Sequence, residues 1–151
     1  IRLNLPSFDI KVSGSKQHPQ NWDVLRRKFI TLTPEEWVRQ HFVHFLIEHK
    51  GYPASLLANE IQLKCGDKVL RADSVLYSRE LQPRMIIEYK PLTSPSHRKV
   101  FDPDFGLQSS APCRLLVVSN GAGALHLQDD YESKKYVFFE TIPDYSDLLT
   151  L

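Results

Sequence analysis

Residues 32–50 read LTPEEWVRQHFVHFLIEHK and give the clearest local signal in the chain. Thr33 is a good helix N-cap, Pro34 suits the first helical position, and Glu36 stands three residues after the cap. Gly51 follows the stretch, and glycine commonly ends a helix. The pattern therefore predicts a helix over this stretch.

One side of this helix is expected to pack on a large apolar surface. The residues that recur at helical spacing are Val38, Phe42, Phe45, Leu46 and His49. His41 and His44 stand three residues apart, a spacing that two metal ligands on a helix can have. No acid or cysteine cluster in the nearby sequence completes such a site. We therefore interpret these histidines as structural or surface residues.

The residues that follow the helix change to a period of two, which is typical of strands. A short helical piece is expected near residues 55–58. The ranges predicted as strands are 59–64, 68–77, 85–89, 114–119, 124–128 and 135–140. Gly66 and Asp67 predict the turn of a hairpin between the first two strands. The proline-containing stretch 93–112 is interpreted as irregular or weakly helical.

This order of elements predicts a mixed α/β or α+β fold. A length of 151 residues fits one domain over 1–151, with residues 1–31 as an N-terminal extension packed on it. Because the chain begins at Ile1, we expect it to be a fragment of a longer protein. Cys65 and Cys113 lie in apolar or strand-like contexts, so reduced buried thiols and a cytoplasmic location are expected. Nothing resembles a membrane span or a signal peptide.

The overall charge does not identify a partner. The formal net charge is +1, whereas a dedicated DNA-binding module often has a clearly basic surface. A local basic patch can still be hidden within a neutral total. Arg26, Arg27 and Lys28 form one such basic run. It is interpreted as a solvated segment, with contact to phosphate groups as the alternative.

Three consecutive predicted strands each carry an acid. Glu60 opens the first, Asp73 interrupts the second, and Glu88 follows an apolar run in the third. Burying a carboxylate without a partner destabilises the folded protein by roughly several kcal/mol, unless the carboxylate becomes protonated. These acids therefore indicate a nearby cation or strong hydrogen-bond donor.

Residues two apart on a strand share one face of the sheet, so Glu88 and Lys90 lie on one side. If the strands are neighbours, Asp73 and Glu88 converge on one point. Two close carboxylates repel unless a divalent cation lies between them, and Mg²⁺ (or Mn²⁺ in its place) suits such a site. The ion would activate a water and polarise a phosphoryl oxygen, while Lys90 positions that water or stabilises developing charge. The plainer alternative is an ordinary Glu88–Lys90 ion pair.

The chain also resembles the N-terminal nuclease domain of type I restriction enzyme R subunits. The stretches that carry the resemblance are Leu3–Pro6, Asp23–Lys28, Leu32–Phe42, Tyr52–Pro53, Asn59–Glu60, Arg71–Asp73, Ile86–Lys90, Leu116–Gly121 and Ile142–Tyr145. The resemblance implies a PD-(D/E)XK restriction-endonuclease-like fold, in which helices flank a mixed sheet.

The resemblance also implies roles for individual residues. It makes Asp73 and Glu88, together with Tyr89, ligands of Mg²⁺. Lys90 is then the catalytic lysine, and Glu60 is a catalytic acid at or beside the site. Relatives carry a glutamine, arginine and tyrosine helix motif that falls on residues 102–108 here, where Pro103, Gly106 and Leu107 replace those three side chains.

The leading hypothesis is therefore a Mg²⁺-dependent DNA endonuclease domain of a restriction or defence system. Its expected partners are DNA and further restriction subunits or domains, with a homodimer as a further expectation. The altered residues 102–108 favour an alternative, a non-catalytic module that keeps the nuclease fold for DNA binding or protein docking. Metal binding separates the two hypotheses, because a domain that has lost catalysis should bind the ion poorly.

Overall fold

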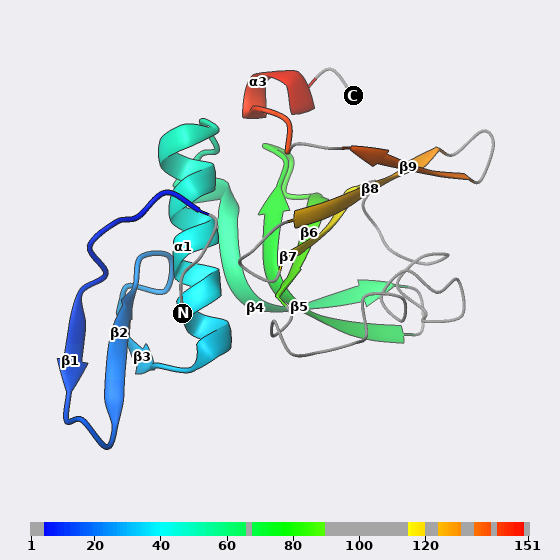
Figure 1. Ribbon diagram of the computed structural model, residues 1–151. Helices are drawn as coiled ribbons and strands as arrows, with labels where there is room; N and C mark the ends of the chain where they lie inside the picture. Colours follow the sequence, from blue (N-terminus) through cyan, green and yellow to red (C-terminus); the bar gives the residue numbers. More distant parts are fainter. Residues whose placement is uncertain are drawn as a thin grey trace.

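A computed structural model describes residues 5–65, 68–89, 115–119, 124–130, 135–139 and 142–149 (Figure 1). Within these ranges the strands are β1 (Val12–Gly14), β2 (Pro19–Asp23), β3 (Lys28–Thr31), β4 (Leu57–Cys65), β5 (Lys68–Tyr77), β6 (Pro83–Tyr89), β7 (Leu115–Ser119), β8 (Ala124–Asp130) and β9 (Lys135–Phe139). The helices are α1 (Pro34–His49), a 3₁₀ turn (Ala54–Leu56) and α3 (Tyr145–Leu148).

The described strands form two sheets. The N-terminal sheet has the order β1-β2-β3 and is antiparallel. The larger sheet has the order β4-β5-β6-β7-β8-β9 and is antiparallel except at β6 and β7, which run parallel. The prediction of a mixed α and β fold is confirmed.

Helix α1 packs against one face of the larger sheet at strands β4 to β7 (Figure 1). Its buried residues Val38, Phe42, Val43 and Leu46 pack against Leu57, Leu76, Met85, Ile87 and Val117. Thr33 caps the helix, because its side chain accepts a hydrogen bond from the Glu36 N–H at 3.1 Å. Burial of this stripe outweighs the weak intrinsic helix preference of the β-branched and aromatic residues in α1.

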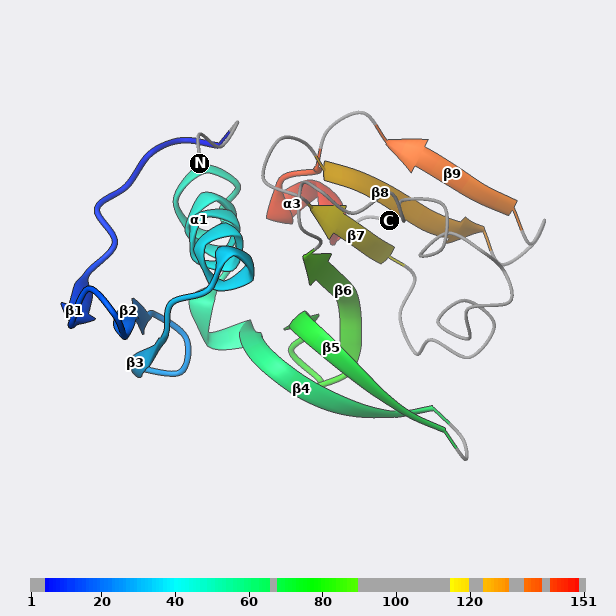
Figure 2. The same cartoon turned by 60° about the horizontal axis from the view of Figure 1, so that its bottom comes forward.

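The β4–β5 hairpin changes faces partway along its length. Leu57 joins the cluster under α1, yet Leu63, at the same parity on the strand, joins a second cluster with Val75 and Ile86. Regular alternation would keep both on one face. The change occurs at Glu60, whose φ of 56° lies in the left-handed region. The outer half of the hairpin therefore curves away and packs on the opposite face of the sheet (Figure 2).

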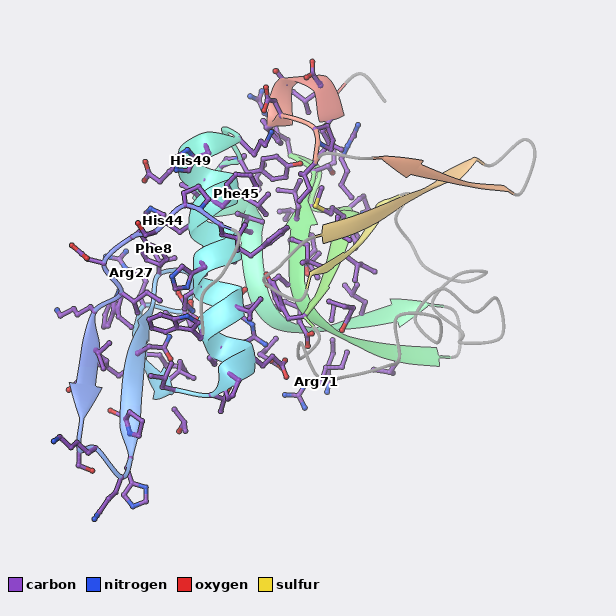
Figure 3. The ribbon with its side chains drawn as sticks, viewed as in Figure 1. Phe8, Arg27, His44, Phe45, His49 and Arg71 are labelled. Atoms are coloured by element: carbon purple, nitrogen blue, oxygen red, sulfur yellow. The ribbon has the colours of Figure 1, made fainter. Side chains whose placement is uncertain are left out.

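The N-terminal sheet packs beside α1 through polar side chains. Asn21 and Asp23 on β2 are both fully buried. Phe8, in the segment before β1, stacks on His44 with ring centroids 3.9 Å apart (Figure 3). Asp23 accepts hydrogen bonds from Asn59 on β4. These contacts join residues 8–23 to the helix and to the larger sheet.

Most predicted elements agree with the structure, with three differences. The helix and the six strand ranges are confirmed to within a few residues at each end. The short helical piece is a 3₁₀ turn that begins slightly earlier than expected. His49 was expected to be buried on this side of the helix but is exposed, whereas Val43 was not expected there and is buried. The N-terminal sheet was not predicted, because its inner face carries the polar Asn21 and Asp23 and so lacks an apolar period.

Across the described ranges, no helix combines the length and apolar character that a membrane crossing requires.

The N-cap gives a direct test of this description of α1. Thr33→Ala should lower the free energy of unfolding by about 1 kcal/mol, because the Glu36 N–H loses its acceptor. Thr33→Ser keeps the hydroxyl and should stay within a few tenths of a kcal/mol, roughly, of the parent. Urea denaturation followed by circular dichroism measures both. Equal stabilities of the alanine and serine variants would contradict the cap.

Candidate metal centre

Three carboxylates from three elements meet at one point. Glu35, Glu60 and Asp73 each offer an oxygen, and these oxygens all lie within 4.8 Å of one another. Glu35 is exposed, whereas Glu60 and Asp73 are half-buried. We call these three residues the acidic triad. Its all-oxygen donor set is of the kind that hard divalent cations bind.

Each member is placed by the fold around it. Glu35 lies in the first turn of α1, directly after Pro34. Glu60 and Asp73 lie opposite each other in the β4–β5 register, between the pairs Asn59–Ser74 and Ile61–Ala72. The ladder is interrupted at this point by the positive φ of Glu60. This local change of backbone direction occurs at one of the two strand residues of the acidic triad.

Two arginines hold Glu60 in place. Arg39 from α1 donates to Glu60 and to Glu36, and its Nη2 lies 3.4 Å from Glu35. Arg71 from β5 donates to the other oxygen of Glu60 at 2.7 and 2.9 Å. The Arg39 side chain is buried and Arg71 is exposed, and Figure 3 shows Arg71 near the N-terminal end of α1.

Negative charge still exceeds positive charge around the triad. Glu35, Glu36, Glu60 and Asp73 face three guanidinium groups, those of Arg39, Arg71 and Arg26, and Arg26 is also shared with Asp23. Burial and the nearby charge of Asp73 raise the pKa of the Glu35 carboxyl. For Glu60, burial acts in the same direction, but the hydrogen bonds from Arg71 and Arg39 outweigh it and lower the pKa. Such an excess of carboxylate charge favours a bound cation.

Asp73 is oriented by the backbone of the next strand. Its Oδ2 accepts a hydrogen bond from the Tyr89 N–H at 3.0 Å. The ladder pairs Ser74 with Ile87, so Asp73 stands beside Glu88 at the next position. The acids at 60, 73 and 88 thus occupy neighbouring positions on β4, β5 and β6. Glu88 is 9% exposed and lies outside the acidic triad.

The comparison with protein families gives one match, and it covers most of the chain. The family described as "Type I restriction enzyme R protein N terminus" matches residues 34–143. The chain belongs to this family. No curated protein matches the chain. Membership of the type I restriction enzyme R N-terminal family supports a nuclease role within a restriction system.

The structure brings some of the predicted site residues of this family member together. Glu60 and Asp73 meet in the acidic triad, whereas the sequence predicted the convergence of Asp73 with Glu88 and placed Glu60 at or beside the site. Glu88 and Tyr89 lie next to Asp73, and metal binding by these two residues stays a prediction. Lys90 and residues 102–108 fall outside the described ranges, so their predicted roles also stay predictions.

Glu35 is the site residue that sequence reasoning missed. In the sequence it reads as a helix-starting acid beside Pro34, because acids are common in the first turn of a helix. The buried face of the helix nevertheless contained an indication of this role. Arg39 lies four residues after Glu35 on the same side of α1, and an arginine on a buried helix face needs carboxylates around it.

A chain of buried hydrogen bonds connects this site to the N-terminal sheet. The Asn59 Nδ2 donates to both oxygens of Asp23, at 3.2 and 3.1 Å. The Asn59 Oδ1 accepts from the Ser74 hydroxyl at 2.6 Å, and that hydroxyl contacts the Tyr89 hydroxyl at 2.9 Å. Because Ser74 gives its one proton to Asn59, Tyr89 is the donor to Ser74. Tyr89 also orients Asp73 through its N–H.

Arg26 forms a second connection from the same aspartate. Its side chain donates to Asp23 and, at 2.8 Å, to Glu36, which Arg39 also contacts. Burial alone would raise the pKa of Asp23, but the hydrogen bonds from Arg26, Asn59 and Leu25 outweigh it and lower the pKa. Asp23 and Arg26 precede the segment that matches the type I restriction enzyme R N-terminal family. The N-terminal sheet, which lies outside the matched residues 34–143, therefore stabilises side chains inside the match.

Asp23→Asn tests this support. At neutral pH the variant should lose about 2–4 kcal/mol of unfolding free energy, because an amide cannot accept all of these donors. The lowered pKa means that the stabilisation is present above 3.8, the usual pKa of the carboxyl, and is lost as pH falls through the folded-state pKa. The difference between parent and variant should therefore shrink as the pH is lowered below 3.8.

Urea denaturation across this pH range measures the effect. Asp9→Asn, an exposed aspartate of the same segment, serves as the control and should leave the unfolding free energy unchanged. A pH-independent difference for Asp23→Asn would show that the charge of Asp23 is not what stabilises the network.

Proposed function

We propose that this chain is a Mg²⁺-dependent deoxyribonuclease domain of a restriction system. The observation that carries the proposal is the acidic triad, in which oxygens of Glu35, Glu60 and Asp73 lie within 4.8 Å of one another. Family membership supplies the nuclease context. The proposed partners are DNA and other restriction-system subunits.

The residues present fit the proposed ion. Carboxylate oxygens are the ligands that Mg²⁺ prefers, and a site with few protein ligands leaves room for the waters that this ion keeps. The exposed Glu35 places the triad at the surface, where a large substrate has access. When bound, the ion would supply an activated water and polarise a phosphoryl oxygen.

The chain's own residues have separate tasks in this proposal. The Tyr89 N–H fixes the Asp73 carboxylate, and buried Arg39 fixes Glu60. Arg71 is 74% exposed, so its guanidinium is available to contact a phosphate of the substrate. Lys90 is proposed to stabilise the charge that develops on the phosphoryl group during hydrolysis.

One observation favours a second candidate, a non-catalytic module of the same fold. Glu60 already has two arginine partners, which is how a purely structural ion cluster satisfies a carboxylate. Such a module would bind DNA or dock a protein without cutting. Metal affinity separates the two, because a structural cluster has no need of a divalent ion.

Asp73→Asn should abolish Mg²⁺ binding, because the amide removes a negative charge from the triad while keeping its shape. Isothermal titration calorimetry with Mg²⁺ or Mn²⁺ measures the affinity, and plasmid nicking measures cleavage on the same samples. Glu80→Gln, at an exposed acid in the β5–β6 loop, is the matched control and should bind and nick as the parent does. A parent chain that binds no metal at millimolar concentration would overturn the nuclease proposal in favour of the docking module.

Arg71→Ala should act in the opposite direction on metal binding. Removing this guanidinium frees one oxygen of Glu60, so Mg²⁺ should bind up to about fivefold tighter, the range expected for an exposed ion pair. The nicking rate should nevertheless fall, because alanine cannot hold the phosphate of the substrate. Calorimetry and nicking together measure this split. Weaker metal binding in Arg71→Ala would contradict competition between arginine and metal at Glu60.

A further inference from the structure

The outer face of the N-terminal sheet carries a row of one lysine and two aromatic rings. Trp22 alternates with the buried Asn21 and Asp23, so it faces away from the body of the molecule. Phe29 on β3 is its cross-strand partner. The backbone N–H of Trp22 donates to the Lys11 carbonyl, so Lys11 lies beside Trp22 on the side opposite to Phe29. We call Lys11, Trp22 and Phe29 the aromatic row.

The aromatic row has a defined geometry. The two ring centroids lie 5.2 Å apart with the rings at 72°, an edge-to-face arrangement. The Lys11 Nζ lies 5.5 Å from the Trp22 ring and 5.8 Å from the Phe29 ring. Lys11 is exposed and both rings are half-buried, so each ring retains accessible surface. Ser13, Gln20 and Thr31 continue this outer face and are also exposed.

Positive charge is concentrated in this part of the chain. Residues 1–31 carry a net charge of +4, whereas residues 32–151 carry −3, so the total of +1 conceals a strong asymmetry. Lys16 is exposed in the connection between β1 and β2, and Lys28 is exposed at the start of β3. Arg27 is exposed in the turn between β2 and β3 (Figure 3). Of the two acids in this segment, Asp23 is buried and paired with Arg26. The accessible surface of the N-terminal sheet is therefore strongly basic.

We propose that this face binds a single strand of DNA. Lys11 would contact a phosphate, and a base would stack on Trp22. Aromatic rings on a sheet within a basic surface are how many proteins hold single-stranded nucleic acids. The inference rests on the proposed function for the choice of DNA. The sheet precedes the segment that matches the family, so its surface is a feature of this chain outside that match.

The position of the sheet connects this surface to the acidic triad. Strand β3 leads into the first turn of α1, and Glu35 lies six positions after Phe29 in the chain. That length of chain spans at most about 20 Å even when fully extended. A strand held on the aromatic row would therefore be retained close to the proposed cleavage site. Removing the aromatic row should weaken substrate binding without changing metal binding.

Fluorescence anisotropy of a labelled oligothymidylate in EDTA tests the surface without cleavage. Lys11→Glu should weaken binding by about fivefold to tenfold. It should also reduce the slope of log K against log salt by about 0.7 for each phosphate that the lysine neutralises. Arg79→Glu, the same type of charge reversal at an exposed residue of the β5–β6 loop, should bind as the parent does. Because the assay contains no metal, oligonucleotide binding is measured independently of cleavage, and that separates this inference from the nuclease proposal.

Tryptophan fluorescence tests the stacking directly, since the chain has only Trp22 and Trp37. Quenching by the oligonucleotide should persist in Trp37→Phe and vanish in Trp22→Phe. Trp22→Ala should weaken binding by about tenfold, whereas Trp22→Tyr, which keeps a ring, should retain most of the affinity. Circular dichroism melts confirm that each variant is folded. Unchanged oligonucleotide binding by folded Lys11→Glu, or quenching that survives Trp22→Phe, would overturn the proposal.

Discussion

The buried guanidinium of Arg39 is the interaction on which the candidate site depends. It lies on the face of α1 that packs on the sheet and is 1% exposed. A charge in that position is costly unless carboxylates surround it. Glu36 and Glu60 accept its hydrogen bonds, Glu35 lies at 3.4 Å, and the Tyr89 ring lies 5.6 Å from the guanidinium carbon. The need to neutralise one arginine therefore gathers acids from the helix and the sheet at one place.

The same requirement explains why the β4–β5 hairpin is distorted where it is. Glu60 adopts a positive φ, which costs a non-glycine residue about 1–2 kcal/mol. Its hydrogen bonds to Arg39 and Arg71 offset that cost. The distortion also moves the outer half of the hairpin onto the second face of the sheet, where Leu63 and Ala72 pack on Val75 and Ile86. One residue thus links the electrostatics of the site to the coverage of the core.

The N-terminal sheet has two faces with different consequences for function. Its inner face sends Asp23 into the network that reaches Asp73 through Asn59, Ser74 and Tyr89. Its outer face carries the aromatic row, which includes the exposed Lys11. Alternation along β2 produces both faces at once, because Trp22 lies between Asn21 and Asp23. Residues outside the family match could therefore serve both the stability of the site and the binding of its substrate.

The sequence by itself determined helix α1, the strands of the larger sheet and the acids that these strands carry. Local signals sufficed for α1, because its cap and first-turn proline act within a few residues. The strands followed from their period of two, and the acids at 60, 73 and 88 followed from their place in consecutive strands. The family was also recognisable from short motifs spread along the chain, and the match over residues 34–143 confirms it.

Only the tertiary structure decided which acids meet. Glu35 joins the triad because α1 packs on the sheet at one particular register, and a local pattern does not contain that register. The direction of Glu60 depends on a left-handed backbone conformation that glutamate rarely adopts unless partners compensate it. The N-terminal sheet escaped prediction because its buried side chains are polar and are satisfied by residues far along the chain, as Asp23 is by Asn59. Long-range hydrogen bonds and ion pairs leave no period in the sequence. For this reason α1 and the larger sheet were predictable, whereas the N-terminal sheet and the place of Glu35 in the triad were not.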